Sequence, residues 1–294
     1  MHRRTFIGAG GAILFMSAIG RPWAEEASVA AKSVTSKDGT SIAFDRVGEG
    51  PALVCVGGAL SERSAWAPYA KLLAPKFTVI TYDRRGRGES GDTAPYAAER
   101  EIEDLEALID EAGGSAFVHG QSSGAVLSLE ATARLPGKVA KLSLYEPPFI
   151  IDDSRPPPPA DYVEHIAELI AGDRRGEAVE YWMTAVVGAP QAAVAQMKGT
   201  PAWPAMEALA HTLPYDIAVL GGNMAGKPLP FEHWSTVTMP TLVMDGSASP
   251  DWIRGSARAL AAGLPNAQHR SLEGQQHSAA PELLVPELVA FFGG

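Results

Sequence analysis

A chain of 294 residues with 46% apolar residues is long enough to bury the core of one large domain. Its formal net charge of −10 argues against nucleic acid as a partner, because contacts to phosphate groups need a basic face. The single cysteine, Cys55, excludes an internal disulfide and a thiolate metal cluster. Cys55 lies in an apolar run over residues 53–56, where a free thiol normally behaves as a small core residue.

The first 24 residues predict an export signal. Arginines at positions 3 and 4 precede an apolar, uncharged run over residues 8–20, and Ala24 is the expected cleavage site. Paired arginines followed by Phe6 and Ile7 resemble a twin-arginine signal, which directs proteins that are exported already folded. A cut near residue 30 is the alternative. We expect a periplasmic or secreted protein without stable membrane insertion, because the apolar run is too short to span a bilayer comfortably.

Strand-like and helix-like segments alternate between residues 33 and 144. The expected strands are short, continuous apolar runs, which are typical of parallel strands whose two faces are covered by helices. We place strands at residues 41–47, 52–56, 77–81, 116–119 and 139–144, and helices at residues 65–73, 98–111 and 122–135. The pattern predicts an α/β fold with a mostly parallel central sheet and helices on both faces.

Prolines interrupt this alternation. Pro147-Pro148 and the prolines at 156–159 stop regular structure, and helix-like sequence follows from residue 162 to about residue 225. A strand returns at Thr241, before a helix at 252–262, a strand at 268–272 and a helix at 281–292. We therefore expect a core made of residues 31–146 and 237–294. Residues 147–236 are expected to form a helical cap, inserted above the carboxyl ends of the strands.

The segment Gly120-Gln121-Ser122-Ser123-Gly124 follows a predicted strand and opens a predicted helix. It matches G-x-S-x-G in the strand–turn–helix context that this motif needs, with Ser122 exposed at the start of the helix. Glycines flank the turn because larger side chains would collide with the packed strand and helix. The helix dipole favours negative charge that develops at Ser122. We predict that Ser122 is a nucleophile; a serine-rich helix N-cap is the ordinary structural alternative.

With this motif the chain resembles the α/β-hydrolase superfamily, and the resemblance covers nearly everything after residue 30. Residues 54–60, Val-Cys-Val-Gly-Gly-Ala-Leu, match the family's HG-x segment with Gly57 in place of the histidine. The resemblance implies that the backbone N–H groups of Ala59 and Ser123 form an oxyanion hole. Residues 83–90 look like the family's D-x-R-G-x-G-x-S turn, and we assign their charges to a local structural network.

The resemblance also implies a catalytic histidine between the last strand and the last helix. His277 lies there, and it needs to accept the Ser122 proton on one ring nitrogen while the other nitrogen donates to a carboxylate. His269 is less suitable, because it lies within the predicted strand and would point into a sheet face. No pair of histidines has the spacing of a metal site, and the expected chemistry requires no cofactor.

The acid of such a triad is missing from its usual place. When the family pattern P-T-L-V-I-x-G-x-x-D is laid on Pro240 onward, its final Asp falls on Ser249. Glu146 ends the strand before the cap, and some branches of the superfamily, including certain haloalkane dehalogenases, carry the acid after this strand. We favour Glu146 on reach and motif register. Asp245 and Asp251 are the alternative acids, one at the end of the strand after the cap and the other two residues past Ser249.

The predicted activity is that of a serine hydrolase, which cleaves a small carboxylic ester or lactone through an acyl-enzyme intermediate. An apolar roof over Ser122 favours an uncharged small-molecule substrate. We place Leu60, Trp182, Trp203 and Trp234 in the substrate pocket, with burial in the cap core as the alternative for the tryptophans. Two alternative functions remain: a cofactor-free haloperoxidase or perhydrolase with the same triad, and a non-catalytic small-molecule binder on the same fold. A dehalogenase is excluded, because that reaction needs a carboxylate at position 122.

Overall fold

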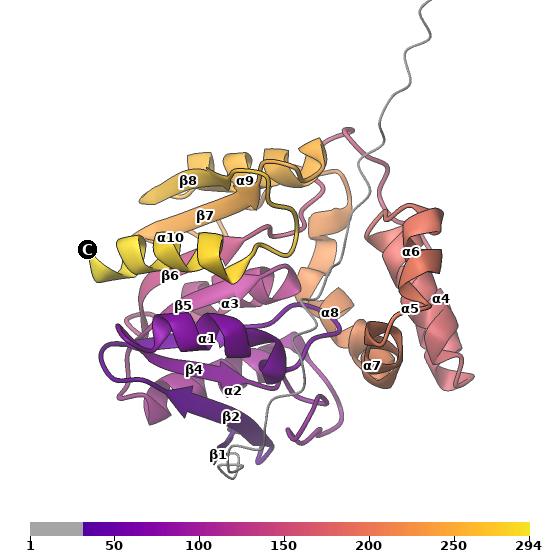
Figure 1. The fold of residues 1–294 in the computed structure, drawn as a ribbon. Helices are drawn as coiled ribbons and strands as arrows, with labels where there is room; N and C mark the ends of the chain where they lie inside the picture. The colour runs from indigo at the N-terminus through magenta and orange to yellow at the C-terminus, as the bar shows by residue number, and fades with distance from the viewer. Residues whose placement is uncertain (1–31) are drawn as a thin grey trace, which may run out of the picture.

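The computed structural model describes residues 32–294, so the expected export signal lies outside the described residues. Its centre is an eight-stranded sheet with the order β1-β2-β4-β3-β5-β6-β7-β8 (Figure 1). The strands are β1 (Lys32–Thr35), β2 (Ser41–Val47), β3 (Ala52–Val56), β4 (Thr78–Tyr82), β5 (Ala116–Gln121), β6 (Val139–Tyr145), β7 (Thr241–Gly246) and β8 (Ala267–Leu272). The pairs β1–β2 and β2–β4 are antiparallel, and every other pair is parallel. This is the mostly parallel sheet that the alternation predicts.

Helices cover both faces of the sheet. On one face lie η1 (Arg63–Trp66), α1 (Ala67–Leu73) and α10 (Pro281–Gly293), and on the other lie α2 (Ala98–Glu111), α3 (Ser123–Arg134) and α9 (Asp251–Gly263). Successive side chains of a strand point to opposite faces, so β3 serves both layers. Its Leu53 and Cys55 join the cluster under α1 and α10, whereas Val54 and Val56 join the cluster under α2 and α3.

The chain between β6 and β7, all of which the structure describes, contains helices, turns and irregular segments but no strand. The helices are α4 (Tyr162–Ala171), α5 (Arg175–Tyr181), η2 (Trp182–Val186), α6 (Gln191–Met197), α7 (Ala202–Leu209), η3 (Ala210–Thr212), α8 (Leu213–Leu220) and η4 (Gly221–Met224). Figure 1 shows α4 to α7 standing beside the sheet, with α8 between them and the core. We keep the word cap for residues 147–236. No helix among residues 32–294 combines the length and apolar character that crossing a bilayer requires.

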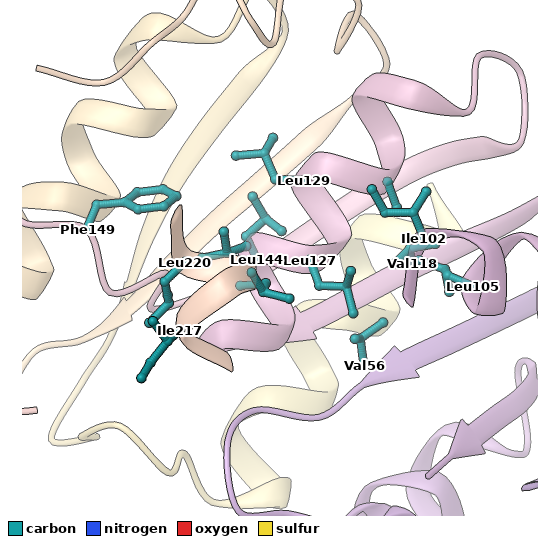
Figure 2. Close-up of a cluster of buried hydrophobic side chains, with 14 of the residues drawn as sticks. Val56, Ile102, Leu105, Val118, Leu127, Leu129, Leu144, Phe149, Ile217 and Leu220 are labelled. Carbon is teal, nitrogen blue, oxygen red and sulfur yellow. The ribbon is translucent and has the colours of Figure 1, made fainter. Parts of the chain in front are cut away.

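The larger apolar cluster ties this helical segment to the core. Figure 2 shows Leu127 of α3 next to the strand residues Val56 and Leu144, in the same cluster as the α8 residues Ile217 and Leu220. Leu127 and Leu220 are almost completely buried. The burial of apolar surface therefore holds α8 against α3, the helix that begins at the predicted nucleophile.

Leu105→Ala tests this packing. Leu105 of α2 is fully buried, so its truncation should leave a cavity and lower the free energy of unfolding by about 2–5 kcal/mol. Leu283→Ala is the matched control, because Leu283 on α10 is 47% exposed and its loss should change stability by no more than about 0.5 kcal/mol. Urea unfolding followed by circular dichroism measures both. Equal effects of the two substitutions would contradict the described core.

Candidate active site

Ser122 sits at a strained turn between β5 and α3. Its backbone angles are φ 56° and ψ −128°, a region that residues with a side chain rarely occupy. The surrounding structure holds this conformation, because the Ser122 amide donates a hydrogen bond of 3.0 Å to the Tyr145 carbonyl on β6. Ser122 is the N-cap of α3, a helix of 12 residues, so its hydroxyl group stands at the positive end of the helix dipole.

Two glycines allow the backbones around Ser122 to approach closely. A Cβ atom on Gly124 would lie 2.5 Å from the carbonyl oxygens of Val56 and Gly57, so α3 meets the end of β3 only without a side chain there. A Cβ atom on Gly58 would lie 2.9 Å from the Cβ of Ser122. The loop after β3 therefore lies directly against the turn that carries Ser122.

That loop carries the first of the two predicted oxyanion donors. Ala59 follows Gly58 in the loop, and Ser123 follows Ser122 as the first residue of α3. The N–H groups in the first turn of a helix have no partner within the helix. Among residues 32–294, neither the Ala59 amide nor the Ser123 amide donates to another backbone carbonyl. Both N–H groups therefore remain available to a bound oxygen atom.

The structure brings His277 and Glu146 together. His277 lies in the loop between β8 and α10, and its Nδ1 is 2.7 Å from Oε2 of Glu146. The other carboxylate oxygen, Oε1, accepts a hydrogen bond of 2.8 Å from the Gly246 amide at the end of β7. The Glu146 side chain is fully buried, whereas the His277 side chain is 18% exposed. The imidazole thus reaches from a buried acceptor toward solvent.

Side chains from the ends of β5 and β6 fix the backbone of the histidine loop. Nε2 of Gln121, the neighbour of Ser122, donates to the His277 carbonyl at 2.7 Å. The Tyr145 hydroxyl group donates to the Gln276 carbonyl at 2.5 Å. Burial, together with the nearby charges of Glu146 and Asp245, raises the pKa of Tyr145 above its ordinary value, so this hydroxyl group stays protonated and can donate. The loop of His277 is therefore tied beside the turn that carries Ser122.

The two alternative acids have other partners. Asp245 is fully buried at the end of β7, where Oδ2 lies 2.5 Å from Nε2 of His269 and Oδ1 accepts a hydrogen bond of 2.6 Å from the Ser271 hydroxyl group. Asp251 opens α9 with a side chain that is 94% exposed, and its partner is Arg254. These contacts of Asp245 and Asp251 do not involve His277, whereas the Glu146 carboxylate is hydrogen-bonded to it.

The residues of the D-x-R-G-x-G-x-S segment divide into two groups. Asp83 bonds within the turn, to the Glu89 amide, and to the nearby Arg63, which agrees with the predicted local network. Arg84 and Arg87, however, reach across to Asp216 on α8, at 2.7 and 2.8 Å. The prediction of a local network was wrong for these two arginines, because their long side chains reach Asp216 in the cap.

Asp216 was missed by the sequence analysis. It is a fully buried carboxylate in the apolar segment Leu213–Leu220, and both of its oxygens accept hydrogen bonds from the core. A single acid among apolar residues of a helix is the signal that would have identified it, because a buried charge needs partners.

The predicted pocket residues lie in different environments. Trp234 is fully buried, stacks on Phe149 and donates to a carboxylate oxygen of Glu130 at 2.9 Å, so it has no free face for a substrate. Trp182 and Trp203 are 5% and 6% exposed. Leu60 is half-buried in the loop after β3 with a φ of 55°, next to Ala59. Leu60 follows Ala59 directly in the chain and therefore lies beside the candidate site.

Burial changes the proton affinity of two further groups near the sheet centre. It lowers the pKa of His119 to about 3, so this imidazole stays neutral, with Nδ1 3.0 Å from the Ser143 hydroxyl group. It raises the pKa of Cys55 to about 12, so the thiol stays protonated. Neither group can supply a charged base or a thiolate nucleophile at neutral pH. Within residues 32–294, no three His, Cys, Asp or Glu side chains are grouped so that they could hold a metal ion.

Comparison with known proteins shows similarity over most of the chain. A model described as the alpha/beta hydrolase family matches residues 53–290. A crystal structure of an alpha/beta hydrolase from Sphaerobacter thermophilus DSM 20745 is 57% identical, with a TM-score of 0.84 over 89% of this chain and 100% of that one.

Two curated proteins match a shorter segment. The uncharacterized hydrolase YraK of Bacillus subtilis (strain 168) is 33% identical over 113 residues, which are 37% of this chain and 42% of YraK. The lipase LipV of Mycobacterium tuberculosis (strain ATCC 25618 / H37Rv) is 32% identical over 108 residues, which are 36% of this chain and 41% of LipV. The matched segments thus span about two fifths of the length of these curated relatives.

The burial of Cys55 predicts that its thiol is inert in the folded protein. A thiol with a pKa of about 12 and no solvent exposure should not react with Ellman's reagent at about pH 8. The same protein in guanidinium chloride should release one equivalent of chromophore per chain, because it has one cysteine. Full reaction of the native protein within minutes would contradict the described burial.

Proposed function

Because this chain belongs to the alpha/beta hydrolase family, we propose that it is a serine hydrolase that cleaves a small, uncharged carboxylic ester or lactone. The observation that carries this proposal is the hydrogen bond of 2.7 Å between His277 and Glu146, in a loop tied beside the strained Ser122 turn. The partial match to the lipase LipV supports an ester as the substrate class.

In the proposed reaction Ser122 attacks the carbonyl carbon of the substrate. Nε2 of His277 takes the hydroxyl proton, and Nδ1 donates to the Glu146 carboxylate, which stabilises the resulting imidazolium. The same proton then passes to the leaving oxygen, and the C–O bond breaks to give an acyl-enzyme. A water molecule, deprotonated by His277, attacks the acyl carbon and releases the carboxylic acid and the free Ser122 hydroxyl group.

The oxyanion of each tetrahedral intermediate would lie between the Ala59 and Ser123 amides. Loss of one such donor costs about 3–4 kcal/mol of transition-state stabilisation in well-studied enzymes. The nearby guanidinium groups of Arg84 and Arg87 already have carboxylate partners in Glu101 and Asp216. A negatively charged substrate would therefore find their charge neutralised, which supports an uncharged substrate.

The N-terminal sequence supports a proposal for where the enzyme acts. The twin-arginine-like pattern of residues 1–24 supports export of the folded protein to the periplasm or beyond. Export in the folded state also suits a protein with one buried thiol and no disulfide to form.

A fluorophosphonate probe should label Ser122. We expect one label per chain, on the peptide that contains Ser122, because the probe reacts with a serine that a histidine activates. Ser122→Ala should abolish labelling and lower ester turnover by at least about a thousandfold, since removal of a triad nucleophile leaves only residual catalysis. Ser123→Ala should still be labelled. A wild-type chain that resists the probe would favour a non-catalytic binder on this fold.

Glu146→Gln should lower kcat for a chromogenic ester by about two to four orders of magnitude, because an amide cannot stabilise the imidazolium as a carboxylate does. Asp245→Asn is the matched control: this carboxylate is equally buried, but His269 and Ser271 hold it. We expect its kcat within about threefold of the wild type, because the side chain of Asp245 bonds to His269 and Ser271 on β8, while Glu146 is held by the backbone of β7. If Asp245→Asn collapses and Glu146→Gln does not, the acid assignment is wrong.

A further inference from the structure

Asp216 lies on α8, in the cap, yet its carboxylate is buried against the core, where it contacts the Ser123 hydroxyl group and two arginines that reach the loop of Ala59. We propose that Asp216 is a positioning residue that holds the Ala59 and Ser123 amides in place and thereby makes the oxyanion hole depend on the seating of the cap. This inference rests on the proposed function, because it concerns the site where the oxyanion would form.

The first carboxylate oxygen of Asp216 holds Ser123, the residue that supplies one of the two amides. Oδ1 of Asp216 accepts a hydrogen bond of 2.7 Å from the Ser123 hydroxyl group and another of 2.7 Å from Nη1 of Arg84. Nη1 of Arg84 also lies 3.4 Å from the Gly57 carbonyl oxygen. The residue that supplies one oxyanion amide is thus anchored to the cap through its own side chain.

The second carboxylate oxygen acts on the Ala59 side through Arg87. Oδ2 of Asp216 accepts a hydrogen bond of 2.8 Å from Nη2 of Arg87, and Nη1 of the same guanidinium donates to the Gly58 carbonyl at 2.6 Å. The Ser61 hydroxyl group donates to that carbonyl as well, at 2.8 Å. In a planar trans peptide the carbonyl and the next N–H point in opposite directions. Fixing the Gly58 carbonyl therefore fixes the direction of the Ala59 N–H.

The charges of this cluster balance. Arg84 and Arg87 are cations, Asp216 and Glu101 are anions, and all four side chains are at most 2% exposed. Burial alone would raise the pKa of Asp216, but the charges of Arg87 and Arg84 and the hydrogen bond from Ser123 outweigh it and lower that pKa. The carboxylate is therefore ionised at neutral pH, and its two oxygens act as strong acceptors.

Asp216 is the member of this cluster that comes from the cap. Arg84 and Arg87 lie in the loop after β4, Glu101 lies on α2, and Ser123 lies on α3. Displacement of α8 would leave Arg87 without the Asp216 carboxylate and Arg84 with Glu101 alone, which is costly for buried cations. Seating of the cap over the substrate and alignment of the two oxyanion amides are thus coupled by one carboxylate.

Asp216→Asn tests the proposal, with Asp104→Asn as the matched control. Asp104 is equally buried and pairs with Arg85 of the same turn at 2.6 and 2.8 Å, but these contacts do not involve the loop after β3. Both changes convert a buried, guanidinium-bound carboxylate into an amide. Activity is expressed per folded chain. Urea unfolding shows that each variant is folded, and the amount of fluorophosphonate label at completion counts the reactive chains.

We expect kcat of Asp216→Asn to fall about 10- to 100-fold, because a misplacement of about 1 Å in a catalytic site costs up to about 10². Its KM should stay within about threefold, since the ground-state carbonyl depends little on the oxyanion donors. An alkyl boronic acid, which mimics the tetrahedral intermediate, should lose affinity in the same proportion. Asp104→Asn should keep kcat within about threefold of the wild type, because Asp104 bonds to Arg85, whereas Arg84 and Arg87 keep Asp216.

A kcat for Asp216→Asn within about threefold of that for Asp104→Asn overturns the proposal. The proposal is also overturned if the KM rises by the same factor by which boronate affinity falls. If Asp216→Asn does not fold, Arg87→Lys replaces it under the same criteria, because one ammonium group cannot reproduce the forked contact with Asp216 and Gly58. A wild-type chain without ester turnover and without label contradicts the proposed function itself. If the wild type is active and Asp216→Asn keeps the kcat of the Asp104→Asn control, this inference alone is contradicted.

Discussion

The candidate site depends on the short hydrogen bond between Glu146 and His277. It joins the end of β6 to the loop before α10, two segments 131 positions apart in the chain. The bond has a defined geometry because two further hydrogen bonds hold Glu146. The Gly246 amide donates to its carboxylate, and its own amide donates to the Met244 carbonyl. A histidine on a surface loop thereby gains a fixed ring orientation, which the proposed proton transfers need.

The parallel pairing of β6 with β7 explains why the carboxylate on β6 has this role. Tyr145 pairs with Met244, so Glu146 and Asp245 end neighbouring strands at the same edge of the sheet. Asp245 bonds to His269 and Ser271 on the far neighbour β8, whereas Glu146 bonds toward His277. Ser249, at the usual place of the acid, is buried and its hydroxyl group has no hydrogen-bond partner among the described residues. Two neighbouring carboxylates therefore serve different histidines.

Much of the fold could be predicted because local patterns decide it. The bounds predicted for β2, β3 and α2 equal those in the structure, since apolar runs and an amphipathic period mark them. β1 was not predicted, because four largely exposed residues carry no apolar pattern and become a strand only by pairing with β2. Trp234 illustrates the same limit: the sequence left open whether it lines the pocket or lies in the cap core, and contacts with Phe149 and Glu130 bury it. Asp216 also depends on such long-range contacts, which no local pattern records.

The buried cluster around Asp216 has a physical cost that stability alone does not explain. Removing two guanidinium groups and two carboxylates from water costs several kcal/mol per ion, and apolar side chains of similar volume often stabilise a protein as well or better. A guanidinium group, however, can donate to a carboxylate and to a carbonyl at the same time, as Arg87 does with Asp216 and Gly58. Apolar side chains have no donor with which to orient a peptide plane. We therefore infer that the charges serve to orient the Gly58–Ala59 peptide. Asp216 can contribute to this orientation only while α8 is packed against α3, because it acts through Arg87.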